Sequence, residues 1–217
     1  MKVLAINGSP RKTWNTATLL NKALEGAASV GAETEIIHLY DLNYKGCTSC
    51  FACRLKGGES YGNCGYKDEL TPVLKNIREV DALILGSPIY FGTVTGEMKS
   101  FIDRLLFPYQ VFDANMNSLF PKKIPVGFIY TMGAHEARMK GTVIDQHIQM
   151  NEFVLRSIFG ASESIVVTET RQFDDDSKYA SSFKVEGKER SRMETRALDC
   201  EKSYKMGVKL AKKLSVK

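Results

Sequence analysis

The chain has 217 residues, of which 43% are hydrophobic and 25% charged, and its formal net charge at pH 7 is +5. This length suits one well-buried domain, and no apolar run approaches the roughly 18 residues of a membrane span, so we expect no membrane insertion. The basic excess is concentrated in residues 184–217, without an RNA-binding or zinc-finger motif. We interpret it as a solvated helix face rather than as a nucleic-acid surface.

The first residues form a predicted strand and lack the charged region, long apolar core and cleavage site of a secretory signal. The last residues carry no lipidation or retention signal. We therefore expect a cytoplasmic protein, whose cysteines are more suited to metal or redox chemistry than to a disulfide framework.

Short apolar runs alternate with helix-period segments along the chain. The runs are rich in Val, Ile and Leu and are continuous, which is typical of parallel strands covered on both faces. They lie at 3–6, 82–86, 124–130 and 164–168. A further strand is expected at 33–39, where the pattern alternates more, as an edge strand does.

Helical periodicity predicts helices at 16–28, 96–107 and 141–159. Thr71 followed by Pro72 predicts the start of another helix, with a capping hydroxyl and then proline in the first turn. Alternating strands and helices predict a doubly wound α/β sheet, with ligands in the crevice beyond the carboxyl ends of the strands.

The segment from residue 171 is polar and is predicted to be a loop that leads to a last helix at about 190–214. We expect one domain over 1–217. The apolar face of the last helix is predicted to comprise Ala197, Cys200, Tyr204, Gly207, Val208, Ala211 and Leu214.

The stretch "NGSPRKTWNTATLL" leads from the first strand into the first helix. Such a turn presents free backbone N–H groups and the positive end of a helix dipole, which favour an anion. It matches neither the Walker loop nor the dinucleotide-binding glycine pattern. Its donors suit the terminal oxygens of a phosphate monoester such as FMN, and the alternative is a capped turn in which Asn15 or Thr16 only starts the helix. These donors are Ser9, Arg11, Lys12, Thr13, Asn15, Thr16 and Thr18.

A second turn, "GSPIYFGTVTGEMKSFIDRL", follows the strand predicted at 82–86. It places an apolar and aromatic strip next to the first turn, where a flat heteroaromatic ring could lie. The alternative is that Tyr90 and Phe91 are core residues. The strip consists of Pro88, Ile89, Tyr90, Phe91 and Gly92.

Together the two turns resemble those of the flavodoxin-like NAD(P)H-dependent FMN reductases, and particularly those of the branch called iron-sulfur flavoproteins. The resemblance covers about residues 1–170. It implies a three-layer α/β/α sandwich with a five-stranded parallel sheet in the order 2-1-3-4-5, FMN at the point where the strand order reverses, and a homodimer or homotetramer. One departure is Trp14, which stands where that family usually has a small residue.

By position, the resemblance implies that FMN is bound by three parts of the chain. The phosphate would be held by Ser9, Arg11, Asn15, Thr16 and Thr18. The isoalloxazine ring would be flanked by Pro88, Ile89, Tyr90, Phe91 and Gly92, and its far side closed by the loop Thr131, Met132 and Gly133.

The resemblance also implies an FMN-dependent oxidoreductase, in which NAD(P)H or another donor reduces bound FMN and FMN passes electrons to a small-molecule or protein acceptor. Such chemistry needs no side-chain base, so we predict no catalytic residue. The alternative is an electron carrier that exchanges electrons with ferredoxin-like partners.

A cysteine-rich loop is expected at 46–66, with Cys47, Cys50, Cys53 and Cys64. The C-x-x-C-x-x-C spacing gathers three thiolates as a 4Fe-4S cluster needs, and a fourth ligand can return through a loop. In iron-sulfur flavoproteins the corresponding set binds such a cluster. Here the last gap of ten residues is longer than is usual for that branch, so a cluster, zinc and free thiols are all kept as alternatives.

Overall fold

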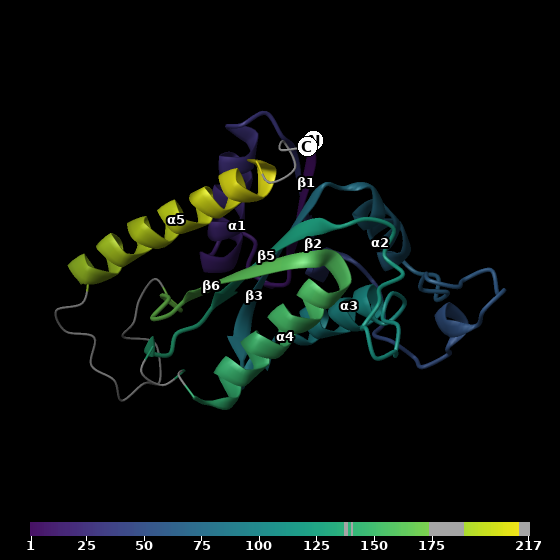
Figure 1. Cartoon of the computed structure of the whole chain (residues 1–217). Helices are drawn as coiled ribbons and strands as arrows, with labels where there is room; N and C mark the ends of the chain where they lie inside the picture. Colours follow the sequence, from purple (N-terminus) through teal and green to yellow (C-terminus); the bar gives the residue numbers. More distant parts are fainter. Residues whose placement is uncertain (137–138, 140, 174–188, 213–217) are drawn as a thin grey trace.

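The computed structural model describes residues 1–136, 139, 141–173 and 189–212. Their central element is a sheet with helices on both faces (Figure 1). Five strands run parallel in the order β2-β1-β3-β5-β6, and the short β4 pairs antiparallel with the end of β3. The strands are β1 (Lys2–Asn7), β2 (Glu33–His38), β3 (Ala82–Tyr90), β4 (Thr93–Val94), β5 (Ile124–Thr131) and β6 (Gly160–Val167).

The predicted sheet order is confirmed for the parallel strands, and β2 lies at an edge as its pattern indicated. Two strands extend four residues beyond the predicted range at one end. The strand expected at 82–86 continues to Tyr90 because its last two residues pair with β4. The strand expected at 164–168 begins at Gly160, because residues 160–163 already pair with β5.

The helices form two layers (Figure 1). Successive strand residues point to opposite faces, so Leu4 and Ile6 pack into one core and Val3 and Ala5 into the other. In the part of the chain described here, no helix is both long and apolar enough to cross a membrane. One layer holds α1 (Asn15–Ala28) and α5 (Glu189–Lys212), and the other holds α2 (Leu70–Glu79), α3 (Gly96–Leu106) and α4 (Val143–Phe159).

Helices α1 and α5 approach each other backbone to backbone. A Cβ on Gly207 would lie 1.7 Å from the carbonyl oxygen of Ala23, and a Cβ on Gly26 would lie 2.1 Å from that of Tyr204. The predicted apolar face of α5 is therefore wrong in part: Ala197 and Tyr204 are exposed, because the face that packs against α1 is the one that carries Gly207. Leu214 lies outside the described residues. From Arg196 to Lys212, the buried positions of α5 are Asp199, Ser203, Met206, Gly207, Leu210 and Ala211.

Helix α2 begins at Leu70, one residue before the predicted capping threonine. The side chain of Asp68 accepts the N–H of Leu70 at 3.1 Å, while the Thr71 hydroxyl accepts the N–H of Asp68 at 3.1 Å. The prediction was wrong about the cap because a carboxylate two residues before the helix satisfies its first N–H. Of the predicted polar loop from residue 171, only residues 171–173 are described.

Candidate functional site

The two predicted turns lie side by side, because β1 and β3 are neighbours in the sheet. The N–H of Gly8 donates to the carbonyl oxygen of Gly86 at 2.8 Å, and the Thr95 hydroxyl donates to that of Gly8 at 2.7 Å. The Thr95 hydroxyl also accepts the N–H of Met98 at 3.3 Å, which caps α3. A Cβ on Gly8 would lie 2.8 Å from the Met98 Cβ, so this close approach requires glycine.

A buried asparagine gives the first turn its shape. The side-chain oxygen of Asn7 accepts the N–H of Ser9 at 3.0 Å, and its amide nitrogen lies 2.8 Å from Nδ1 of His38. Burial lowers the pKa of His38; Asp41 opposes this shift and Lys12 reinforces it. The neutral ring is therefore favoured, and its Nδ1 accepts from the Asn7 amide.

Helix α1 begins without a side-chain cap. Trp14 is the N-cap residue and its side chain makes no capping hydrogen bond, whereas Asn15 and Thr16 lie in the first turn. Asn15 therefore starts the helix, as the alternative to phosphate binding has it, but neither Asn15 nor Thr16 is the N-cap residue. The Trp14 ring packs against Arg11, whose guanidinium carbon lies 4.7 Å from the ring centroid. The first N–H groups of a helix have no intrahelical partner, so this end suits an anion.

Two predicted phosphate donors bind oxygens of the segment that follows β6. Nη1 of Arg11 donates to the carbonyl oxygen of Gln172 at 2.6 Å. Nδ2 of Asn15 donates to that of Arg171 at 2.8 Å. Both hydrogen bonds are exposed, and both donors are already aimed at oxygen atoms, as phosphate binding needs.

The third predicted loop meets the first turn through a buried hydroxyl pair. The hydroxyl oxygens of Thr16 and Thr131 lie 2.8 Å apart. Gly133 follows in the same loop, and a Cβ there would lie 3.1 Å from the side-chain nitrogen of Gln172. Thr18 is half-buried, and its N–H donates to the Trp14 carbonyl oxygen at 2.9 Å, as a helical residue does.

The aromatic residues of the second turn face outward. Tyr90 is 45% exposed and Phe91 fully exposed, so the alternative that they are core residues is wrong. Phe91 and Gly92 have φ values of 49° and 87° and form the tight turn between β3 and β4. A non-glycine residue in this conformation is strained, which makes the turn a candidate for ligand contact. Pro88 and Ile89 are half-buried at its base.

Several residues that support the site were not predicted from the sequence. Asn7 precedes the turn glycine and Thr95 precedes α3, so both could have been found as polar residues at element ends. His38 and Gln172 could not, because only the folded chain brings them to the turn. The predicted residues that the structure joins by contacts around the first turn are Ser9, Arg11, Asn15, Thr16, Thr131 and Gly133.

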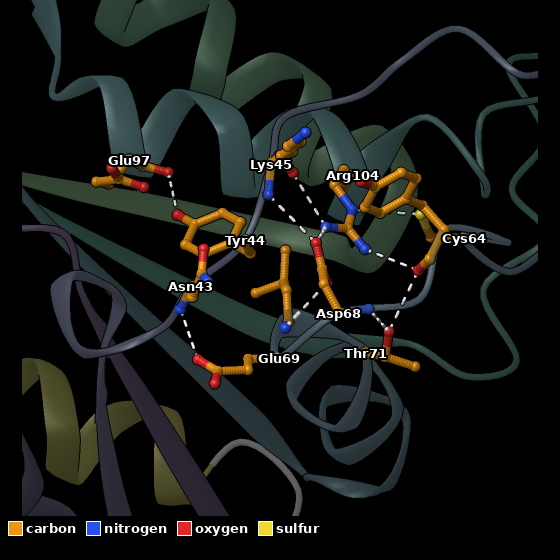
Figure 2. Close-up of polar contacts among 11 residues, drawn as sticks. Asn43, Tyr44, Lys45, Cys64, Asp68, Glu69, Thr71, Glu97 and Arg104 are labelled. Carbon is orange, nitrogen blue, oxygen red and sulfur yellow. Dashed lines mark hydrogen bonds and ion pairs between the residues drawn. The ribbon is translucent and has the colours of Figure 1, made fainter.

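The cysteine loop follows β2 and runs along α3. The Tyr44 hydroxyl donates to the carbonyl oxygen of Glu97 at 2.6 Å (Figure 2). A Cβ on Gly46 would lie 3.2 Å from the Ser100 hydroxyl oxygen. The chain is therefore packed against α3 where it reaches Cys47. Helix α3 in turn begins directly after the second turn.

The ten-residue gap before the last cysteine folds back on itself. The N–H of Gly58 donates to the carbonyl oxygen of Leu55 at 3.0 Å, and the N–H of Gly62 donates to that of Cys53 at 3.0 Å. Cys64 consequently returns to the side of Cys53. Burial raises the pKa of the Cys53 thiol, and the neighbouring thiols of Cys64 and Cys50 raise that pKa further. The length of the gap does not separate the fourth cysteine from the others.

All four cysteines line one hollow of about 20 Å³, together with residues that include Arg104 and Phe107. This is room for about one water molecule. Cys53 is buried and Cys64 half-buried, while Cys47 and Cys50 are exposed. As the side chains of the described residues stand, no three His, Cys, Asp or Glu groups are close enough to hold a metal ion. The four thiols are therefore the ligand type that a cluster needs and lie around one hollow, but their sulfur atoms are not all in ligating positions.

Comparisons with known proteins identify the family. The profile described as NADPH-dependent FMN reductase matches residues 1–169. An iron-sulfur flavoprotein of Archaeoglobus fulgidus is 49% identical over 104 residues, which is 48% of this chain and 48% of the relative. One from Methanocaldococcus jannaschii is 41% identical over 104 residues, 48% of this chain and 51% of the relative. The match thus spans about half the length of these curated relatives.

Solved structures share the fold at low identity. An NAD(P)H:quinone oxidoreductase from Methanothermobacter marburgensis has a TM-score of 0.67 at 16% identity, covering 97% of this chain and 96% of its own. An azoreductase from Bacillus anthracis has a TM-score of 0.66 at 15% identity, covering 96% of this chain and 99% of its own. With its flavodoxin-like sheet and a profile match over most of its length, the chain belongs to the NADPH-dependent FMN reductase family.

Proposed function

We propose that the chain is an FMN-dependent oxidoreductase of the cytoplasm. In this proposal NAD(P)H reduces bound FMN, and FMN passes the electrons to a small-molecule or protein acceptor. Family membership supports the proposal. The observation that carries it is the junction of the two turns through Gly8 and Thr95, between β1 and β3, where the strand order reverses. Ligands of doubly wound sheets bind at that point.

In the proposed site, the donors of the first turn hold the phosphate. When the phosphate binds, Arg11 releases the carbonyl oxygen of residue 172 and Asn15 releases that of residue 171. Each then donates to a phosphate oxygen, because hydrogen bonds to a charged acceptor are stronger than those to a neutral one. The uncapped end of α1 adds N–H groups. The other phosphate residues in this proposal are Ser9, Thr16 and Thr18.

The second turn and the third loop would orient the ring. Bound FMN supplies the hydride chemistry, and the chain supplies position and the exclusion of competing reactions. This proposal assigns no general base. The ring-flanking residues are Pro88, Ile89, Tyr90, Phe91 and Gly92 on one side and Thr131 and Gly133 on the other.

The absorption spectrum of the purified protein and a titration with FMN test the cofactor. Anaerobic mixing with NADH and with NADPH in a stopped-flow instrument then tests the activity. We expect rapid, saturable bleaching of the flavin with at least one nucleotide. A colourless protein that takes up no FMN contradicts the proposal. A flavin that neither nucleotide bleaches favours an electron carrier with ferredoxin-like partners, the second candidate, which the four-cysteine loop supports.

We also propose that Cys47, Cys50, Cys53 and Cys64 bind a 4Fe-4S cluster. Their shared hollow and the return of Cys64 to Cys53 support it, as does the name of the curated relatives. Anaerobic purification should yield about four iron and four sulfide atoms per chain, lost in Cys50→Ser. Zinc in their place, or four thiols open to alkylation without iron, contradicts the cluster.

The same family resemblance leads us to propose a homodimer or homotetramer. Exposed apolar side chains support it: Phe91 and Val143 are both exposed, and a Cβ on Gly92 would lie 3.9 Å from Val143 Cγ1. Sedimentation velocity of the flavin-loaded protein decides this. A monomer at all concentrations contradicts it.

A further inference from the structure

A buried arginine holds both ends of the cysteine loop (Figure 2). Arg104, near the end of α3, has a side chain that is 0% exposed. Its Nη1 donates to the carbonyl oxygen of Lys45 at 3.0 Å and its Nη2 to that of Tyr66 at 3.0 Å. Lys45 precedes the loop and Tyr66 ends it, so one guanidinium closes the loop 46–66 at its base.

A carboxylate completes this closure. Asp68 Oδ2 lies 2.5 Å from Nη1 of Arg104 and also accepts the N–H of Lys45 at 3.2 Å. Burial alone would raise the pKa of Asp68, but the hydrogen bonds from Arg104 and from Lys45 outweigh it and the pKa is lowered. Both backbone polar groups of Lys45 are therefore held by one ion pair. A buried charge is stable only when its partners are in place.

A further hydrogen bond of Arg104 goes to sulfur rather than to oxygen. Its Nε–H donates to Sγ of Cys64, with 3.3 Å between the two atoms. Cys64 is the last of the four cysteines, the one that the ten-residue gap must bring back. An N–H bond to a cluster-ligating sulfur stabilises the more negative, reduced cluster and so raises its reduction potential.

Helix α3 connects this closure to the flavin turns. Thr95 caps the helix and binds the first turn through Gly8, and Arg104 lies nine residues later on the same helix. At 1.5 Å per residue this separation is about 14 Å along a rigid element. Arg104 thus fixes the cysteine loop relative to the proposed flavin site.

We infer that Arg104 is a positioning residue of the proposed 4Fe-4S site. It closes the loop so that Cys64 lines the same hollow as the other three cysteines, and its N–H bond to Cys64 would raise the potential of a cluster bound there. The inference rests on the cluster proposed above, and it adds a function for a side chain that supplies no ligand itself.

The test compares the anaerobically purified wild type with Arg104→Lys, which keeps the charge but loses the planar fork of donors. Arg78→Lys is the matched control, because Arg78 donates to Asn63 in the same loop, a residue without sulfur. Three quantities are measured: iron and labile sulfide per chain, the midpoint potential of the cluster, and bound flavin as a check of folding.

We expect Arg104→Lys to keep its flavin, to lose most of its iron, and to hold any remaining cluster at a more negative potential than the wild type. Arg78→Lys should match the wild type. Iron content and potential that are unchanged in Arg104→Lys overturn the inference and leave the cluster standing. Equal losses in Arg78→Lys overturn it as well, because they mean general loosening of the loop.

Wild-type protein that contains no iron overturns the proposed cluster and the inference with it. The proposed reduction of FMN by NAD(P)H is tested by the stopped-flow experiment and does not depend on this outcome. If Arg104→Lys does not fold, Asp68→Asn decides, since it weakens the closure but keeps Arg104 beside Cys64. Lost iron with retained flavin then supports the inference, and full iron overturns it.

Discussion

Side chains of the first turn fall into two groups. Asn7, Ser9 and Thr95 bind the turn's own backbone and so determine its shape. Arg11 and Asn15 instead bind carbonyl oxygens of the segment after β6, where other oxygens can replace them. Substitutions in the first group should distort the turn, and substitutions in the second should remove a ligand contact.

Replacing Asn15 by alanine should weaken FMN binding by about 1 to 3 kcal/mol, because a phosphate oxygen is left without its donor. Thr16→Ala should have an effect of similar size. Titration of the apoprotein with FMN, followed by flavin fluorescence, measures both. Lys22→Ala is the control, since Lys22 lies on the exposed face of α1 and pairs with Glu25. Unchanged affinity in both variants means that the phosphate lies elsewhere.

Acidification should weaken FMN binding through His38, whose pKa burial lowers from 6.5. The neutral ring contributes fully above that value, and its contribution is lost as the pH falls through the lowered pKa of the folded state. If Nδ1 of His38 is protonated, its N–H points at the amide nitrogen of Asn7, which is also a donor. Rotating the Asn7 amide by half a turn would bring that nitrogen against the N–H of Ser9 instead. One donor is left without an acceptor in either case.

Affinity measured from about pH 8 to pH 5 tests this, although the FMN phosphate itself titrates near 6. The His38→Gln variant separates the two effects, because its amide oxygen can accept from Asn7 and does not titrate. We expect a steeper loss of affinity in the wild type than in this variant. Parallel profiles would rule out the role of His38.

At the scale of elements, glycines determine how the helices pack. Gly207 and Gly26 let α1 and α5 cross with their backbones in contact. Alanine would favour helix formation at position 207 by about 1 kcal/mol, but its Cβ would overlap a carbonyl oxygen of α1. The backbone overlap outweighs the helix propensity, because a carbonyl oxygen cannot move aside as a flexible side chain can.

Gly207→Ala should therefore lower the free energy of unfolding by about 1 to 3 kcal/mol. Denaturant unfolding followed by circular dichroism measures it. The control is Gly96→Ala at the first position of α3, where a Cβ meets nothing within 4 Å. A variant as stable as the wild type would mean that α5 can shift without cost.

The ion pair at the base of the cysteine loop also stabilises the start of α2. Asp68→Ala leaves buried Arg104 without its counter-ion and should cost about 3 to 5 kcal/mol at pH 7. The pKa of Asp68 is lowered from 3.8, so its contribution is present above that pH and is lost as the pH falls through the lower, folded value. The stability difference from the wild type should shrink in that range. A difference that does not change with pH excludes the carboxylate as its source.

At the scale of the whole molecule, ligand binding adds to global stability. A ligand that binds only the folded chain adds about 2.7 kcal/mol at a concentration 100 times its Kd. FMN should therefore raise the unfolding temperature clearly, and riboflavin, which lacks the phosphate, should raise it less at equal concentration. Thermal unfolding of the apoprotein with each ligand measures the difference. Equal shifts would mean that the first turn holds no phosphate.

Periodicity and end signals in the sequence predicted the five parallel strands, four of the helices and the start of α2 to within a few residues, but not the short β4. Their success has a physical reason, since continuous apolar runs and 3.6-residue patterns reflect burial that each element needs. The order of the strands came from the resemblance of the two turns to a known family. The predicted single domain over 1–217 stays a prediction.

By itself, the sequence determined the chemistry of the two candidate sites, because residue types such as Asn15 and Cys64 carry their donors and thiols wherever they lie. Only the tertiary structure decided which groups meet. His38 reaches Asn7 from β2, Gln172 reaches Arg11 across most of the chain, and Arg104 reaches Cys64 from α3. The buried face of α5 was also decided there, by the approach of α1. Local patterns record how each element is buried, but contacts between distant segments depend on how the elements pack, which no local spacing encodes.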